Sequence, residues 1–498
     1  LWTVKDSPRN WFSLDVLSNG QFNQSSLFYS RLKPLEFDLS LVFTIEGLWQ
    51  HQEQMLKEGL NKKRFINAGE MGIGKTLPTL ELLNLLKRSG SLWWIGPNSG
   101  LTALRTQLQK WKYLDLFKND DKIFNYHKLL QMMEVVKDPP QAIVFDECHA
   151  LKNPSSRRTQ LAIQLTIEME KKWGNDCIVI GLTGTPAPEN HFDWWSIAEV
   201  IRPGWLRESS FFKYKYRLGE FGTAEMGYPI FLNWRNHIGS HKKICNNEKC
   251  EVCSILPRRL KGLILVTWKK DCLDLPEKIY ETRKLKISES TKRVAQALTK
   301  IYSGAQLQAK LRELSDGFIY AENGEEERGE TPKDQELIDI SEEIKESNCK
   351  RLVVYAAFTA SVDRCTSTLL KNGWIVWKYD GRGQEYLGCL DLINETIFQD
   401  IEKFSQPIAF VGNPEAAGQG LTLTPASTIV YFSNSFKSQY RIQSEDRIHR
   451  FGASKERGCK IIDLIHLPTD ELILNRLKEK RDVEMLTLKE IEYAFIAQ

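Results

Sequence analysis

Residues 67–83, NAGEMGIGKTLPTLELL, place a short glycine-containing loop between two apolar segments. Gly69, Gly74, Lys75 and Thr76 fit the pattern G-x-x-x-x-G-K-[ST], in which backbone amides surround phosphate groups. The segment before the loop has a short apolar core suited to a strand, and the segment after it repeats leucines at helical spacing. Strand, loop and helix in this order bring the free amides of a helix N-terminus to bound phosphates.

The loop therefore predicts a nucleotide site rather than a plain turn before an ordinary helix. Lys75 would reach the terminal phosphates, and the Thr76 hydroxyl would bind Mg²⁺. Gly69, Gly72 and Gly74 would let the backbone approach the ligand closely.

The length of 498 residues is enough for two or more domains. Lysine and arginine number 68 against 64 acidic residues, so the net charge of +4 neither predicts nor excludes nucleic-acid binding. No run of eighteen apolar residues occurs, and the first ten residues lack the features of a signal peptide. We expect an intracellular protein with reduced thiols and no membrane partner.

A second pattern, QAIVFDECHALKN, is an apolar run that ends in acidic residues at 146 and 147. It is typical of a buried parallel strand, with the acids at the edge where α/β sheets bind their ligands. Phosphoryl transfer to water needs one carboxylate to hold Mg²⁺ and another to orient or deprotonate the water. Asp146 suits the first role and Glu147 the second. A solvated turn is the alternative, but it is less expected some 70 residues after a phosphate loop.

A third apolar strand, in CIVIGLTGTPAPEN, ends in Thr183, Gly184 and Thr185. In order and spacing, the three patterns resemble motifs I, II and III of superfamily 2 helicases and translocases. The resemblance implies that Thr183 and Thr185 couple the nucleotide site to movement. The segment LWQHQ is similar to the Q motif of this superfamily, in which Gln52 would contact the adenine edge.

Two further segments resemble the Snf2-like branch of that superfamily. LKNPSSRRTQ is similar to the extension that follows its acidic motif, with Lys152 and Asn153 matching. Residues 413–453 resemble its motifs V and VI, which would make Gly420 part of the nucleotide site and Gln443 a coupling residue.

Arg447 and Arg450 are three residues apart, and we expect them on one face of a helix. Alone they would suit a solvated basic edge, but within motif VI they resemble arginine fingers that stabilise charge on the transferring phosphoryl group. Residues 350–358 and 374–383 resemble motif IV and a neighbouring strand, so a second lobe is expected.

The expected fold is α/β, with two RecA-like parallel-sheet lobes, a helical protrusion and a small N-terminal module. The segment TWKKDCLDLPEK keeps Leu275, Pro276 and Lys278 of the branch's linker, but Thr267 and Trp268 stand where arginines are expected, which puts lobe coupling by this segment in doubt. The expected domains are an N-terminal module at 1–40, lobe 1 at 41–257 with a Cys-rich insertion at 237–253, a linker and protrusion at 258–345, and lobe 2 at 346–498.

The insertion has two interpretations. Four side chains within it could bind one structural Zn²⁺ ion, or they could be reduced thiols and histidines of a hydrophilic surface loop. The candidate ligands are His241, Cys245, Cys250 and Cys253.

Nucleic-acid contacts in such motors come from loops in both lobes and go to the phosphate backbone. The candidates are Asn98 and Ser99 in IGPNSGLTALRTQLQKW, which resembles motif Ia, and Thr422 and Lys437 near motif V. FFKYKYR, residues 211–217, could stack on bases at a fork, or it could be an amphipathic segment packed on lobe 1.

The resemblance implies an ATP- and Mg²⁺-dependent translocase on double-stranded DNA that remodels forks or branched junctions (branch migration) in replication, recombination or repair. A strand-separating helicase that tracks single strands and an ATP-switched DNA clamp remain alternatives. An RNA-directed enzyme is disfavoured by the form of motifs V and VI. The resemblance also implies a protein of the cytoplasm or nucleoid of a bacterial or phage-infected host. Residues 1–40 carry none of the motifs of the family, and they could be a small substrate-recognition module or a strand and helix packed on lobe 1.

Overall fold

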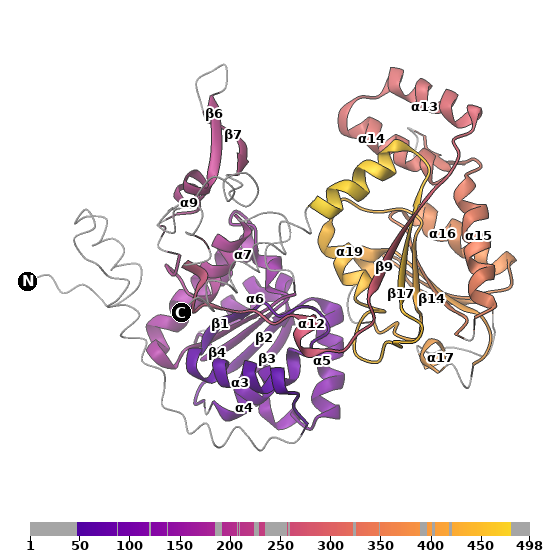
Figure 1. Cartoon of the computed structure of the whole chain (residues 1–498). Coiled ribbons are helices and arrows are strands. Elements are labelled where there is room, and N and C mark those ends of the chain that lie inside the picture. Colours follow the sequence, from indigo (N-terminus) through magenta and orange to yellow (C-terminus); the bar gives the residue numbers. More distant parts are fainter. Residues whose placement is uncertain are drawn as a thin grey trace, which may run out of the picture. The chain divides into compact units, whose positions relative to one another are not determined.

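The computed structural model describes residues 47–479, except 87, 119–120, 137, 185–191, 207, 209, 224–228, 235–255, 257–258, 322–324, 348, 389–395, 401–403 and 418–420. The chain divides into two compact units between Cys272 and Leu273, and each unit contains a large sheet of its own (Figure 1). The N-terminal module expected at 1–40 lies outside the described residues.

The first unit is built on a six-stranded sheet in which every strand pair is parallel. Short apolar runs form its strands because a parallel sheet covered on both faces buries every side chain of its central strands. In sheet order the strands are β3 (Lys122–Asn125), β2 (Leu92–Gly96), β4 (Ala142–Asp146), β5 (Ile178–Leu182), β1 (Arg64–Asn67) and β8 (Ile264–Leu265).

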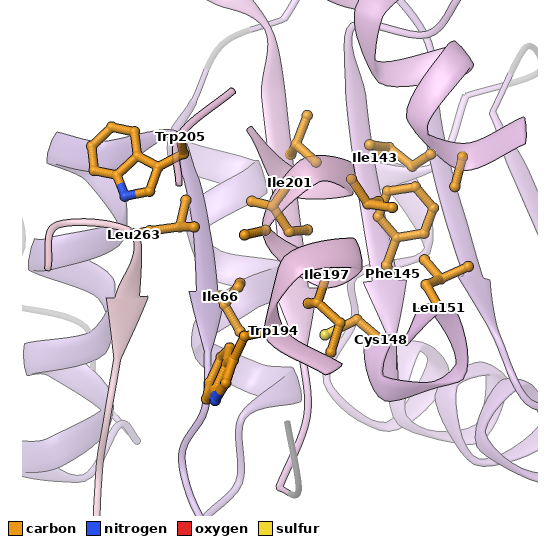
Figure 2. Close-up of a cluster of buried hydrophobic side chains, with 14 of the residues drawn as sticks. Ile66, Ile143, Phe145, Cys148, Leu151, Trp194, Ile197, Ile201, Trp205 and Leu263 are labelled. Carbon is orange, nitrogen blue, oxygen red and sulfur yellow. The ribbon is translucent and has the colours of Figure 1, made fainter. Parts of the chain in front are cut away.

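Helices cover both faces of this sheet, and each face has its own hydrophobic core. One core takes its side chains from α3 (Gln50–Lys62), α4 (Thr76–Leu85) and α5 (Asn98–Lys110). The other takes them from α6 (Leu129–Val135), α7 (Arg157–Trp173), α8 (Asp193–Ile201) and α9 (Phe211–Leu218). Figure 2 shows the second core, where Trp194, Ile197 and Ile201 of α8 lie over Ile66 and Phe145 of the sheet.

The second unit holds a seven-stranded sheet that is parallel except for its pair β13–β14. In sheet order its strands are β14 (Gly383–Leu387), β13 (Ile375–Asp380), β15 (Ile408–Gly412), β12 (Arg351–Tyr355), β16 (Thr428–Tyr431), β17 (Cys459–Ile465) and β9 (Lys278–Lys284). On one face the core includes α15 (Pro332–Lys345) and α16 (Thr359–Lys371).

Shorter elements complete the second unit. The helices α13 (Glu289–Ile301) and α14 (Gly304–Ser315) are adjacent and correspond in place to the expected protrusion. The hairpin β10–β11 (Phe318–Tyr320 and Glu326–Arg328) follows them. Other helices of this unit include α17 (Thr396–Gln399), α18 (Pro414–Ala417) and α19 (Ser438–Glu445).

The α/β class with two parallel-sheet lobes is confirmed. The first unit extends to Cys272, beyond the boundary expected at residue 257, because β8 adds residues 264–265 to the first sheet. Two hydrogen-bonded residues are too few to produce a periodic pattern in the sequence. Within the described residues, no helix is long and apolar enough to cross a membrane.

Candidate nucleotide-hydrolysing site

The phosphate loop connects β1 to α4, as the sequence predicts, and α4 begins at Thr76. Gly72 and Gly74 adopt positive φ angles of 81° and 79°, which side-chain-bearing residues rarely adopt. A Cβ atom at Gly74 would also overlap the amide of Gln52. The loop thus needs glycine here for both its backbone conformation and its packing.

Lys75 lies at the N-cap position of α4 and bends back over the loop. Its ammonium group donates hydrogen bonds to the carbonyl oxygens of Gly69, at 2.7 Å, and Glu70, at 3.1 Å. The side chain is therefore held beside the amides of the helix N-terminus. Such a cation suits a phosphate ligand, whose oxygens are stronger acceptors than carbonyls.

The first turn of α3 positions this loop. The Gln52 amide is buried, accepts from the backbone N–H of Trp49 at 3.0 Å and donates to the carbonyl of Gly74 at 3.0 Å. The ring of His51 contacts the carbonyl of Ile73 through Nε2 at 2.8 Å. Gln52 therefore positions the loop; its contact with adenine stays a prediction.

Asp146 ends β4, at the same edge of the sheet at which β1 leads into the phosphate loop. Burial raises the pKa of Asp146 to about 7 and the charge of Glu147 adds to this, while the ammonium of Lys75 acts in the opposite direction. A buried carboxyl group beside a second carboxylate is stabilised in its charged form by a divalent cation. The site therefore fits Mg²⁺, with Asp146 and Thr76 as its candidate protein ligands.

Glu147 is left-handed, with φ of 51°, and begins the turn that carries His149 back to it. The His149 Nδ1 atom lies 3.2 Å from the Glu147 carboxylate and 3.2 Å from the Thr183 hydroxyl. The Thr183 N–H in turn donates to the carbonyl of Asn67, at the end of β1. His149 therefore links the acidic motif to Thr183, which directly follows β5 and is hydrogen-bonded to the end of β1.

Sequence reasoning gave His149 no role. His149 lies only two residues after Glu147, in a short turn, so its side chain stays near the acidic motif. This spacing is the sequence signal that indicates a role for His149. Gly184 packs against the phosphate loop, since a Cβ atom there would overlap the side chain of Met71. Thr185 lies outside the described residues.

The two arginines of the second unit lie beyond α19, which ends at Glu445, so the expectation that they share a helix face is wrong. Both are nevertheless directed to one point: Arg447 donates to the carbonyl of Leu421 at 3.1 Å, and Arg450 to the same carbonyl at 3.2 Å. Arg450 also donates to the Thr422 hydroxyl at 3.0 Å. The guanidinium groups thus converge on the segment that resembles motif V.

A buried ion-pair network fixes α19 in place. Arg441 binds Asp463 of β17 through two hydrogen bonds, of 2.5 and 2.9 Å, and Glu445 through one of 2.8 Å. Lys278 of β9 donates to Glu445 at 3.0 Å and to Asp446 at 3.3 Å. The network positions the chain just before the two arginines.

The other coupling and nucleotide candidates of this unit are less defined. Gln443 is buried, and neither atom of its amide has a hydrogen-bond partner among the residues that the structure describes. Gly420 lies outside those residues.

The nucleic-acid candidates lie at the ends of elements. Asn98 begins α5 and accepts a hydrogen bond from Asn125 at 2.7 Å, while the Ser99 side chain lies outside what is described. Thr422 is bonded to Arg450, and Lys437 pairs with Glu415 at 3.0 Å. Contact with nucleic acid would have to compete with these hydrogen bonds and this ion pair. Nucleic-acid binding by the four residues stays a prediction.

Within the described part of the chain, no group of three or more His, Cys, Asp or Glu side chains could hold a metal ion, and this part does not include the proposed zinc ligands.

The linker departs from the expected pattern at residues that have structural roles here. The carbonyl of Thr267 accepts from the N–H of Glu70 at 2.9 Å, and Trp268 is buried in the core of the first unit. The N–H of Lys269, at the start of α12 (Lys269–Cys272), donates to the Glu70 carboxylate at 2.5 Å. The linker therefore begins against the phosphate loop.

The sequence of this chain is similar to those of several known proteins. The family model of the SNF2-related domain matches residues 118–351. A Mycoplasma pneumoniae protein named as an uncharacterized ATP-dependent helicase is 23% identical over 482 residues, which cover 91% of this chain and 43% of the relative. The nuclear protein STH1/NPS1 of Saccharomyces cerevisiae is 23% identical, covering 84% of this chain and 33% of its own length.

Two solved structures also align with the chain. The Sulfolobus solfataricus SWI2/SNF2 ATPase core, solved in complex with dsDNA, has a TM-score of 0.36 and 20% identity, covering 89% of this chain and 97% of that one. The Pyrococcus furiosus Hef helicase domain has a TM-score of 0.48 and 10% identity, covering 86% and 98%. The chain spans less than half the length of the two curated relatives, from Mycoplasma pneumoniae and Saccharomyces cerevisiae.

Proposed function

Because the chain is a Snf2-like protein of superfamily 2, we propose that it hydrolyses ATP and uses the energy to move along double-stranded DNA. One observation carries the proposal: the carboxylates of Asp146 and Glu147 and the ammonium of Lys75 lie at one edge of the first sheet and influence each other electrostatically. Nucleotide hydrolysis needs this combination of a phosphate-binding cation, a metal-binding carboxylate and a second carboxylate for water.

Each residue has one role in this proposal. Lys75 and the amides at the start of α4 bind the phosphates. Asp146 and Thr76 would hold Mg²⁺, which would neutralise the charge that develops during phosphoryl transfer. Glu147 orients the attacking water and accepts its proton, and His149 holds the Glu147 carboxylate in position. Arg447 and Arg450 supply positive charge to the transferring phosphoryl group.

The finer role that we propose is the remodelling of forks or branched junctions during replication, recombination or repair. The names of the relatives, an ATP-dependent helicase among them, support a nucleic-acid motor. Strand separation is the second candidate, and the exposed aromatic side chain of Phe212 on α9 favours it.

The proposal is tested by steady-state ATP hydrolysis with no nucleic acid, single-stranded DNA, linear duplex, a branched junction and RNA. Duplex or junction should stimulate hydrolysis strongly. Glu147→Gln should lower kcat by about a hundredfold or more and leave ATP binding intact, since it removes the proton acceptor and keeps the shape.

Stimulation by single strands or RNA alone would reject the duplex translocase in favour of a conventional helicase. No stimulation by any of these nucleic acids would favour a DNA clamp that ATP switches between states.

A further inference from the structure

The helix α9 has one face in the core of the first unit. The Phe211 ring lies edge-on to the rings of Phe192 and Trp195, with centroids 6.4 and 5.7 Å away, and Tyr214 is 1% exposed. Ser210 caps the helix by accepting a hydrogen bond from the N–H of Lys213. This face confirms the amphipathic packing that the sequence offered as one of two interpretations.

Another face of α9 is aromatic as well, although it is not in the core. Phe212 is 64% exposed, and its ring centroid lies 4.5 Å from that of Tyr216, one helical turn on. The Tyr216 ring is stacked on Phe221 with a centroid distance of 4.2 Å and an interplanar angle of 13°. These three residues form what we call the aromatic row.

The row joins the helix to a hairpin. Phe221 belongs to β6 (Gly219–Thr223), which pairs antiparallel with β7 (Pro229–Trp234), and the hairpin extends away from the sheet next to α9 (Figure 1). The register of the pair shifts between Glu220 and Phe221. Such irregularities re-aim side chains, and here Phe221 lies against Tyr216.

The helix that carries two residues of the row is basic. Residues 211–218 contain three basic residues and no acidic one, although Glu220 precedes Phe221 in β6. Lys213 is exposed beside Phe212, and Lys215 extends over the Phe192 ring at 5.9 Å. The exposed ring of Phe212 with the exposed ammonium group of Lys213 suits an unpaired stretch of nucleic acid, whose bases stack on aromatic faces and whose phosphates bind ammonium groups.

We propose that the aromatic row of Phe212, Tyr216 and Phe221 is a stacking platform for an unpaired DNA base at the single-stranded side of a fork. Bases inside a duplex are already stacked on each other and have no free face for Phe212 or Tyr216. The row therefore distinguishes a fork from a linear duplex. This inference rests on the proposed function and specifies the substrate of the same motor.

The test measures binding of the full chain, without ATP, to a fork that carries 2-aminopurine as its first unpaired base and to a blunt duplex of the same sequence. Wild-type protein should quench or shift the 2-aminopurine fluorescence. The double substitution Phe212→Ser with Tyr216→Ser should raise the Kd for the fork about tenfold, as expected for the loss of one stacked base. The Kd for the blunt duplex should not change.

Two control variants distinguish stacking from other causes. Phe212→Trp keeps an aromatic face and should keep the fork affinity and the fluorescence change. Val135→Ser removes an exposed apolar side chain from α6 of the same unit and should change neither. A folding defect in the double variant would appear as a lower Tm and a higher Kd for the blunt duplex; Phe212→Ser alone, compared with Phe212→Trp, then decides the question.

The inference is overturned if the double variant binds fork and duplex with wild-type affinity, or if Phe212→Trp loses fork binding as Phe212→Ser does. Its failure is separate from failure of the proposed function. The latter would appear as wild-type ATP hydrolysis that no nucleic acid stimulates, whereas fork binding is measured without ATP.

Discussion

At the scale of single residues, the site depends on contacts that the sequence indicates only in part. The pattern around Lys75 and Asp146 predicts their position because both follow apolar strands at the ligand-binding edge of a parallel sheet. The spacing places His149 near Glu147, but its contacts depend on the left-handed conformation of Glu147 that turns the chain back, which the sequence does not indicate.

His149→Ala should lower kcat for ATP hydrolysis about tenfold and leave KM for ATP nearly unchanged. The substitution removes the ring between the Glu147 carboxylate and the Thr183 hydroxyl, while Lys75 and the loop amides stay in place. Steady-state kinetics with duplex DNA measure both constants. His127→Ala, at an exposed histidine of the same unit, is the control. A rise in KM alone would mean that His149 serves nucleotide binding instead.

At the scale of elements, the central strands were predictable and the ends of elements were not. The continuous apolar runs AIVFD and IVIGL could be predicted as buried strands. Glu445, the last residue of α19, contacts Lys278, and Arg441 one turn earlier contacts Asp463; both partners are distant in the sequence. Such long-range contacts leave no local pattern in the sequence. The sequence therefore predicts a helix that includes Arg447 and Arg450, whereas α19 ends at Glu445.

The ion pairs that hold α19 should make the second unit sensitive to acid. Burial acts to raise the pKa of Glu445, but Lys278 and Arg441 more than offset this and lower it to about 2. A lowered pKa contributes stability that is present above the usual value near 4.5 and is lost as the pH falls toward 2. The contribution at neutral pH is about 3 kcal/mol.

Urea unfolding monitored by fluorescence at pH 7, 5, 4 and 3 measures this dependence. Glu445→Gln should lower the unfolding midpoint at pH 7 and flatten its decline below pH 4.5. If the variant and the wild type decline in parallel, Glu445 is not the group responsible.

At the scale of the whole molecule, the linker is held at both ends although it lacks the expected arginines. In the first unit Glu70 of the phosphate loop accepts from the N–H of Lys269. In the second unit Lys278 pairs with Glu445 and Asp446, and His449 contacts the carbonyl of Pro276 at 2.8 Å. Thr267 and Trp268, which stand where arginines are expected, contribute a backbone hydrogen bond to Glu70 and packing in the core of the first unit instead of side-chain charge.

Glu70→Ala should therefore uncouple DNA from ATP hydrolysis. We expect the ratio of DNA-stimulated to basal hydrolysis to fall about fivefold, the low end of ordinary coupling energies, while basal hydrolysis changes less. Glu70→Gln keeps an acceptor for the Lys269 N–H and should retain most of the ratio. Equal loss of basal and stimulated rates in Glu70→Ala would mean that Glu70 only shapes the phosphate loop.

The position of β9 also has a consequence for biosynthesis. Of the described strands of the second unit, β9 is made first, yet its parallel neighbour in the sheet is β17, which is made last among them. A ribosome that adds about 5 to 20 residues per second needs roughly 10 to 35 s to proceed from Lys284 to Cys459. During that interval β9, including Ile279 and Tyr280, has no strand to pair with. The nascent chain is then most open to chaperones and to mispairing with other strands.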